Sequence, residues 1–240
     1  MVYKIADFYI EIDTGFPENE RIFAPYLARE KRGPDFTITV SDTEIDEEYE
    51  IFVRENGNLK CLRSYLARNV VLRKISSEIL SRGAFLIHGA LIAYKGRGYL
   101  FSAKSGTGKT THIRLWQKLF GEENVTIVNG DKPFLRIDGD EIYGYGTPWC
   151  GKERYNVNMR VPLDGVCFIE RAEENQIQKI SEFDAVQRLF SQVEIKSSAN
   201  LEAQLELLDA LVTRVDMYKL SCNMELEAAK VAYEGMKKDR

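Results

Sequence analysis

Apolar and polar residues alternate along the first part of the chain with the period of a half-buried β-strand. The alternation covers residues 2–12 and returns over residues 35–40. Between residues 49 and 62, the pair Asn56-Gly57 separates two further strand-like runs, which is typical of a hairpin. The pattern therefore predicts a small β-rich N-terminal lobe, to which we assign residues 1–64.

The pattern changes at Tyr65, where the apolar positions begin to follow one face of a helix that continues to Leu80. Gly83 lies just beyond and is a natural helix stop. This helix opens a second region, residues 65–240, in which strand-like and helix-like segments are mixed. We predict strands or hairpins at 85–93, 98–102, 125–128, 134–145, 166–170 and 215–220, and helices at 110–120, 184–194, 200–213 and 223–236.

A chain of 240 residues with 44% hydrophobic and 29% charged residues has the composition of an ordinary globular protein. Single cores usually stop growing near ~250–300 residues, so we expect one α/β core with a small lobe. The formal net charge of -4 and a pI near 5.5 give no general attraction to polyanions. Nucleic acid and membrane surfaces are therefore not the expected partners.

The N-terminus has no basic head followed by an apolar stretch, so we expect no signal peptide. No apolar run approaches the roughly 20 residues of a membrane-spanning helix. The four cysteines are far apart and form no CxxC pair, which indicates neither a zinc site nor a disulfide framework. A cytoplasmic location fits this cysteine usage best.

The most specific motif is the segment from Ala103 to Thr110, AKSGTGKT, which has the spacing of a phosphate-binding P-loop. Alanine stands in place of the first glycine. Backbone amides in such a loop point at an anion, and the helix that follows adds its dipole. The residues expected to hold a nucleoside triphosphate are Ser105, Gly106, Thr107, Gly108, Lys109, Thr110 and Thr111.

Within this loop, Lys109 is expected at the β- and γ-phosphates, and the Thr110 hydroxyl is suited to coordinate Mg2+. A second acid is needed, and Asp131 is the leading candidate because it directly follows the predicted strand 125–128. The alternative for the loop is a glycine turn that binds nothing. The alternative for Asp131 is a turn aspartate before Pro133.

Two segments taken together resemble the HPr kinase/phosphatase superfamily, whose P-loop fold is shared with phosphoenolpyruvate carboxykinase. The segments are HGALIAYKGRGYLFSAKSGTGKTTH and the following IVNGDKP. The resemblance covers residues 85–135. It implies a P-loop kinase core of this type, a mixed sheet with flanking helices. It also implies that His88 lies near the phosphates and that Asp131 matches the second aspartate of an acidic pair, the first being replaced by Gly130.

By the same resemblance, Asp131 acts as general base on a serine hydroxyl, and His88 tunes it. The alternative for His88 is a core histidine whose hydrogen-bonding groups are satisfied within the protein. His112 is expected at the exposed start of the helix. Because the first aspartate is missing, the kinase direction is favoured over phosphatase activity.

The segment from Gly146 to Tyr155 reads as a loop with turn residues and charges. Lys152 or Arg154 is a candidate for stabilising charge on the transferred phosphoryl group, and Glu153 for binding Mg2+ or orienting the acceptor. A plain solvated loop is the alternative. Arg171 is interpreted as a charged strand end.

These features predict a kinase that uses ATP and Mg2+ to phosphorylate a hydroxyl, with serine of a peptide or protein as the favoured acceptor. A kinase for a small molecule is the nearest alternative, and the carboxykinase reaction is less favoured. A catalytically inactive, nucleotide-dependent protein that binds a peptide or acts as a switch belongs to a different class. Assembly into homo-oligomers is an open expectation.

Overall fold

The computed structural model describes residues 1–57, 59–190, 192 and 201–238. The chain forms two compact units, Met1–Ile79 and Leu80–Arg240. The first unit contains β1 (Val2–Ile5), β2 (Phe8–Asp13), α1 (Pro17–Phe23), η1 (Ala24–Tyr26), β3 (Phe36–Thr39), α2 (Asp42–Asn56) and α3 (Arg63–Glu78).

The first unit ends later than the expected boundary at residue 64, because α3 belongs to it. Leu66 and Ala67 of α3 pack with Ile45 of α2 in a small buried cluster. The three strands form one sheet in the order β1-β2-β3, with β1 and β2 antiparallel and β2 and β3 parallel. The strand predicted over residues 35–40 is therefore confirmed as β3, whereas residues 2–12 form two antiparallel strands, β1 and β2, separated by a turn at Ala6 and Asp7, and not the single strand that the alternation suggested.

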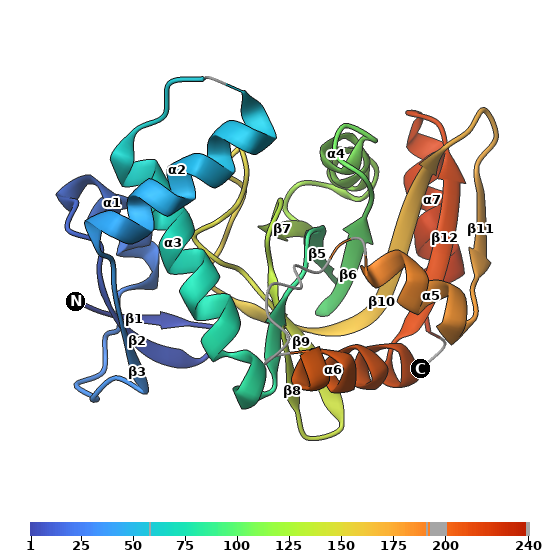
Figure 1. The fold of residues 1–240 in the computed structure, drawn as a ribbon. Coiled ribbons are helices and arrows are strands. Elements are labelled where there is room, and N and C mark those ends of the chain that lie inside the picture. The colour runs from blue at the N-terminus through green and yellow to red at the C-terminus, as the bar shows by residue number, and fades with distance from the viewer. Residues whose placement is uncertain (58, 191, 193–200, 239–240) are drawn as a thin grey trace. The chain divides into compact units, whose positions relative to one another are not determined.

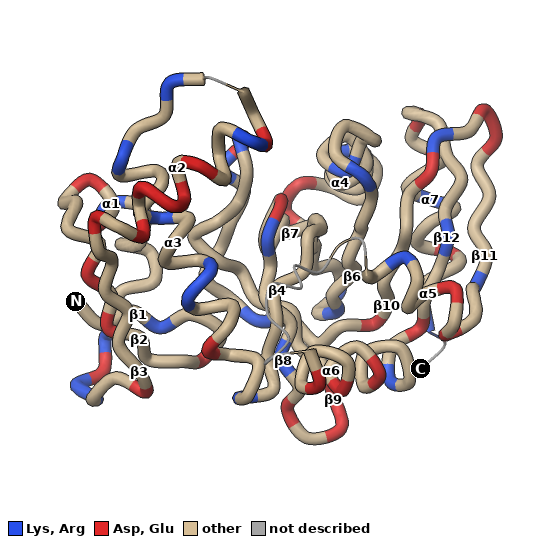
Figure 2. The backbone as a smooth tube through the Cα atoms, in the orientation of Figure 1, with Lys and Arg blue, Asp and Glu red and all other residues tan. Residues whose placement is uncertain are grey.

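The hairpin predicted over residues 49–62 is wrong, because α2 occupies most of that segment. Ser41 and Glu44 form a reciprocal capping box at its start, which satisfies two amides that a helix end otherwise leaves without partners. Gly57, with φ 71°, ends the helix, so the Asn-Gly pair marks a helix terminus. Figure 2 shows the acidic residues of α2 as red bands along the helix.

The second unit contains a mixed sheet in the order β4-β8-β9-β10-β6-β5-β7, extended by β12 beside β10 and by β11 beside β12. Its strands are β4 (Ala84–Leu86), β5 (Ala90–Tyr94), β6 (Arg97–Ser102), β7 (Val125–Asn129), β8 (Phe134–Asp138), β9 (Glu141–Tyr145), β10 (Arg160–Arg171), β11 (Gln176–Lys179) and β12 (Asp216–Cys222). Its helices are η2 (Leu80–Arg82), α4 (Lys109–Phe120), α5 (Glu182–Phe190), α6 (Leu201–Arg214) and α7 (Leu226–Met236).

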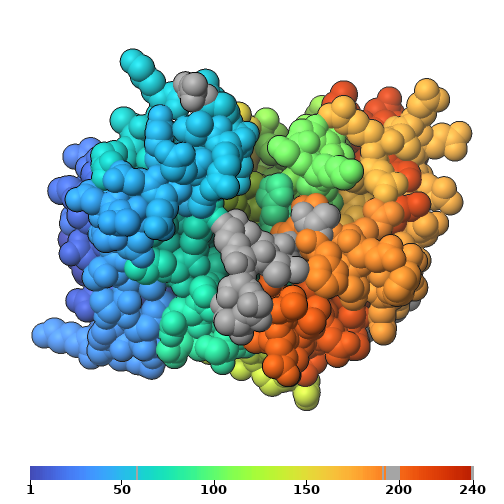
Figure 3. Space-filling view, in the orientation of Figure 1, coloured from blue at the N-terminus to red at the C-terminus, as the bar shows by residue number. Residues whose placement is uncertain are grey.

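Helices cover both faces of this sheet (Figure 1). Trp116 of α4 and the small residues of α7 share one buried cluster with Tyr99 and Phe101 of β6. On the other face, α5 and α6 contribute Leu189 and Leu211 to a second cluster. Figure 3 shows α5 and α6, in orange, on the surface turned toward the viewer. The strands and helices predicted for this region are confirmed as elements, except that residues 85–93 form two strands, β4 and β5, with different partners. The parts of the predicted helices at residues 191, 193–194 and 200 lie outside the described residues. No helix in the described ranges is long and apolar enough to cross a membrane.

The strand directions bring several segments to one edge of the sheet. β6 is parallel to β10 and antiparallel to β5, which is in turn antiparallel to β7. The carboxyl ends of β6, β7 and β10 and the start of β5 therefore lie at the same edge. This is where open α/β sheets place ligands, and the candidate residues converge there.

Candidate functional site

The glycine loop, residues 103–108, connects β6 to α4. Gly106 and Gly108 have φ values of 78° and 125°, in the region that favours glycine, and Gly108 is the N-cap of α4. A Cβ atom built on either glycine would have no other atom within 4 Å, so the space beside both is open. The loop therefore leaves open space beside two glycines at the N-terminus of α4, where a helix can attract an anion.

Lys109 begins α4 and bends back over the loop, where its Nζ donates to the Ala103 carbonyl at 2.9 Å. Burial lowers the pKa of Lys109, and the negative charge of Asp131 partly opposes this shift. The lysine therefore lies within electrostatic reach of Asp131. Thr110 and Thr111 follow in the first turn of the helix.

Asp131 and His88 come together because two chain segments pair beside the sheet. The Gly89 amide donates to the Asp131 carbonyl at 2.9 Å, and the Ile87 amide donates to the Pro133 carbonyl at 3.3 Å. This pairing places His88 Nε2 at 3.2 Å from Asp131 Oδ1. The structure thus brings together the two residues that the sequence marked, at adjacent strand ends.

The Asp131 carboxyl group is half-buried. Burial acts to raise its pKa, but the hydrogen bond and charge of His88, together with Lys132 and Lys109, outweigh burial and lower the pKa below its ordinary value. Asp131 is therefore a carboxylate at neutral pH. It is suited to accept a hydrogen bond or to bind a cation.

The turn that carries Asp131 is fixed by Asn129, the fully buried last residue of β7. Asn129 Oδ1 accepts from the amides of Asp131 at 2.9 Å and Lys132 at 2.7 Å. Its Nδ2 donates to the Thr147 carbonyl and hydroxyl, both at 3.1 Å, and to the Trp149 carbonyl at 3.3 Å. The Thr147 hydroxyl in turn donates to the Lys132 carbonyl at 2.7 Å. One buried amide therefore ties the Asp131 turn to the loop of residues 146–155.

This loop also packs directly against the turn. A Cβ atom on Gly151 would lie 3.2 Å from the Asp131 Cβ atom. Lys152, Glu153 and Arg154 form the exposed tip of the loop. The tip of the loop therefore directly follows Gly151, which packs against Asp131. The catalytic role expected of Lys152 and the metal-binding role expected of Glu153 stay predictions.

Gly130, which stands where the resemblance expects an acid, is enclosed by the same loop. Its amide donates to the Tyr155 carbonyl at 2.8 Å. A Cβ atom at this position would lie 3.2 Å from the Cys150 carbonyl oxygen and 3.3 Å from the Tyr155 Cβ atom. A Cβ atom here would be in tight contact and would require these loop atoms to shift by a few tenths of an ångström, so the present packing favours glycine.

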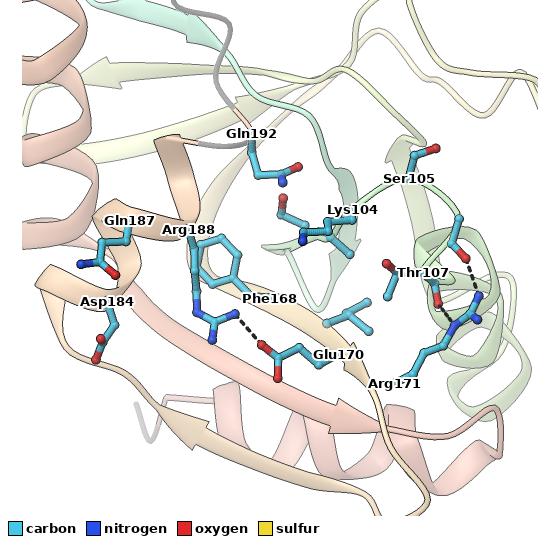
Figure 4. Close-up of a pocket in the computed structure, with 14 residues that line it drawn as sticks. Lys104, Ser105, Thr107, Phe168, Glu170, Arg171, Asp184, Gln187, Arg188 and Gln192 are labelled. Carbon is cyan, nitrogen blue, oxygen red and sulfur yellow. Dashed lines mark hydrogen bonds and ion pairs between the residues drawn. The ribbon is translucent and has the colours of Figure 1, made fainter. Parts of the chain in front are cut away.

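A cavity of about 820 Å3 lies beside the glycine loop. Figure 4 shows Arg171 of β10 reaching the loop and Arg188 of α5 paired with Glu170. The sequence interpreted Arg171 only as a charged strand end, because its contact depends on the register between β10 and β6. The cavity is lined by residues 102–107 and by Phe168, Ile169, Glu170, Arg171, Asp184, Gln187, Arg188 and Gln192.

His112 does not lie at an exposed helix start, as the sequence suggested; only 2% of it is exposed. Its Nε2 accepts from Trp116 Nε1 at 3.1 Å, and its ring packs at 4.6 Å from the ring of Phe101. Burial lowers its pKa to about 3. His112 is therefore a neutral core residue that fixes α4 against β6.

No cluster of three or more His, Cys, Asp or Glu side chains suitable for a metal is found in the described part of the chain. Mg2+ bound together with a nucleotide does not need one, because it takes oxygen ligands from one or two protein groups and from the phosphates. The ionised Asp131 and the hydroxyl of Thr110 are ligands of that chemical kind. The residues present therefore fit Mg2+ carried by a phosphate chain.

No protein-family model matches the chain, and no curated protein matches it. Among solved structures, the chain is similar to the HPr(Ser) kinase/phosphatase from Coxiella burnetii, with 8% sequence identity and a TM-score of 0.37. The match covers 62% of this chain and 94% of that one. A likeness at this TM-score does not indicate an activity for the chain.

Proposed function

We propose that the chain is a kinase that uses ATP and Mg2+ to phosphorylate a hydroxyl group, with serine of a peptide or protein as the favoured acceptor. The observation that carries the proposal is the convergence of Lys109, at the start of α4 beside the glycine loop, with the Asp131–His88 pair. The Lys109 ammonium group and the glycine loop are suited to bind the phosphates of the donor, and the ionised Asp131 carboxylate is suited to orient the acceptor.

In this proposal the loop amides and the Lys109 ammonium group bind the phosphates. The Thr110 hydroxyl and the Asp131 carboxylate provide oxygen ligands for Mg2+, which offsets phosphate charge when it is bound. Phosphoryl transfer depends mainly on positioning and electrostatic stabilisation. The protein therefore has to supply mainly positioning and charge, and little covalent chemistry.

Asp131 also accepts a hydrogen bond from the acceptor hydroxyl and orients it. A carboxylate with a lowered pKa is a weak base, so orientation precedes proton transfer. As the hydroxyl oxygen bonds to the γ-phosphorus, the bond from that phosphorus to the β–γ bridging oxygen breaks, ADP leaves with the electron pair of that bond, and the hydroxyl proton moves to Asp131 Oδ. His88 Nε2, which lies 3.2 Å from Asp131 Oδ1, helps to hold the carboxylate in place.

The test is transfer of label from γ-labelled ATP, with Mg2+, to fractionated peptides, proteins and metabolites. Lys109→Ala and Asp131→Asn are compared with matched exposed controls, Lys118→Ala in the same helix and Asp140→Asn in the β8–β9 turn. Removing a general base typically costs about 10²–10⁴-fold in rate. We expect the first two variants to lose transfer and the two controls to retain it.

Acid-stable label on a peptide or protein supports the serine kinase, and label on a metabolite alone selects the small-molecule kinase. Transfer that survives in Asp131→Asn removes the assigned role of Asp131. A second candidate, a nucleotide-dependent binding or switch protein, is favoured by the enclosed Gly130, which leaves the site with one acid in this turn. For that candidate, ATP binds through Lys109 and its γ-phosphate is retained.

A further inference from the structure

The end of β10 extends beyond the end of β6. The parallel register between the two strands pairs Phe168 with Ser102, the last residue of β6, and Arg171 follows three positions later. At ~3.3 Å per strand residue, Arg171 lies about 10 Å past the end of β6. The strand register therefore places Arg171 alongside the glycine loop.

Arg171 contacts the loop through two successive carbonyls. Its Nε donates to the Thr107 carbonyl at 3.0 Å, and its Nη2 donates to the Gly106 carbonyl (Figure 4). Within the described residues, Arg171 forms no ion pair with a carboxylate. The guanidinium group therefore holds the loop backbone and keeps its positive charge beside it.

The planarity of the peptide bond turns this contact into a constraint on the loop amides. In a trans peptide the C=O and the following N–H point in opposite directions. Because the Thr107 carbonyl faces Arg171, the Gly108 N–H faces away from Arg171. The Thr107 N–H is already used, since it donates to the Lys104 carbonyl at 3.2 Å. Arg171 thus fixes the direction of the Gly108 amide, next to the start of α4.

We propose that Arg171 is a positioning residue for polyphosphate binding, which acts by holding the Gly106 and Thr107 carbonyls so that the Gly108 amide points at the anion. The proposal rests on the proposed nucleotide site. A fork of donors is needed to hold two carbonyls at once, and the single ammonium of lysine lacks that fixed geometry. Charge alone is therefore not sufficient for the role.

The experiment measures binding of inorganic tripolyphosphate, with Mg2+, to the full chain by calorimetry. Arg171→Ala is expected to weaken binding by about tenfold or more, from the loss of charge-assisted hydrogen bonds. Arg171→Lys is expected to bind tripolyphosphate about as weakly as Arg171→Ala does. The matched control is Arg214→Ala, because Arg214 also donates to a backbone carbonyl, that of Gly139 at 2.9 Å, in another part of the unit. It is expected to bind like the parent protein.

A second readout separates positioning from general loss of structure. In protein labelled with 15N-glycine, tripolyphosphate is expected to shift the Gly108 amide resonance in the parent and in Arg214→Ala, but not in Arg171→Lys. Parent-like affinity of Arg171→Lys would show that charge suffices and would overturn the proposal, as would parent-like affinity of Arg171→Ala. Lys109→Ala is run in parallel: if it also binds normally, the nucleotide site itself fails, whereas loss of binding in Lys109→Ala alone rejects only the role of Arg171.

Discussion

At the scale of single residues, the contact between His88 and Asp131 favours the ionised form of the Asp131 carboxyl group. Burial opposes ionisation of Asp131, and the 3.2 Å contact with His88 does most to overcome it. A neutral Asp131 can neither accept a proton nor bind Mg2+ well. In the proposed mechanism, His88 therefore extends the pH range of activity toward acid.

Replacement of His88 by alanine is expected to raise the pKa of Asp131, because burial then acts with less opposition. Activity that needs the carboxylate is lost as pH falls through this pKa, so the acid limb of the pH–rate profile moves to higher pH. His88→Gln is the matched variant, since it keeps a donor but never carries charge. An acid limb at the same pH in His88→Ala would contradict the assigned contact.

At the scale of elements, the buried Asn129 joins β7 to the loop of residues 146–155. It makes three donated and two accepted hydrogen bonds within a fully buried setting. Asn129→Ala leaves several of these partners unsatisfied, at about 1–3 kcal/mol for each buried group that is left without a bond. We expect lower stability and a displaced Asp131.

The partner residue Thr147 gives a finer test of the same junction. Thr147→Val keeps the shape but removes the hydroxyl that donates to the Lys132 carbonyl, whereas Thr147→Ser keeps it. We expect Thr147→Val to unfold at a lower denaturant concentration and to lose phosphate transfer, and Thr147→Ser to retain both. Equal denaturation midpoints for the two variants would show that the hydroxyl does not support the turn.

Among the elements, the sequence predicted those that depend on glycine positions and on the local spacing of apolar residues. The glycine loop, α4 and the strands around them follow from glycine positions and apolar periodicity. The Asn56-Gly57 pair, which predicted a hairpin, marks instead the end of α2, whose start is fixed by the capping box of Ser41 and Glu44. Asn129 and Arg171 could not be assigned, because their partners are distant in sequence and depend on strand register.

At the scale of the whole second unit, α4 is held against the sheet by an aromatic cluster around the fully buried Trp116. Its ring lies 5.1 Å from that of Tyr99, 5.3 Å from that of Phe120 and 5.8 Å from that of Tyr233. Trp116 also donates to His112. The start of α4, and with it the glycine loop, is therefore anchored by core packing.

The buried His112 makes the stability of this unit depend on pH. Its pKa falls from an ordinary value of 6.5 when unfolded to about 3 when folded, so the unfolded state binds the extra proton. Stability is present above the unfolded pKa and falls as pH drops below it, by up to about 1.4 kcal/mol per pH unit. Chemical denaturation between pH 7 and pH 4 should show a flatter dependence in His112→Phe than in the parent; equal slopes would contradict a buried neutral histidine.

The nucleotide site itself is tested most directly by calorimetric titration of the purified chain with ATP and Mg2+. Saturable binding is predicted, weakened about tenfold to a hundredfold in Lys109→Ala through loss of charge-assisted hydrogen bonds, and unchanged in Lys118→Ala. Binding of equal strength in Lys109→Ala, or no binding to the parent chain, would contradict the assignment of the glycine loop as a phosphate site.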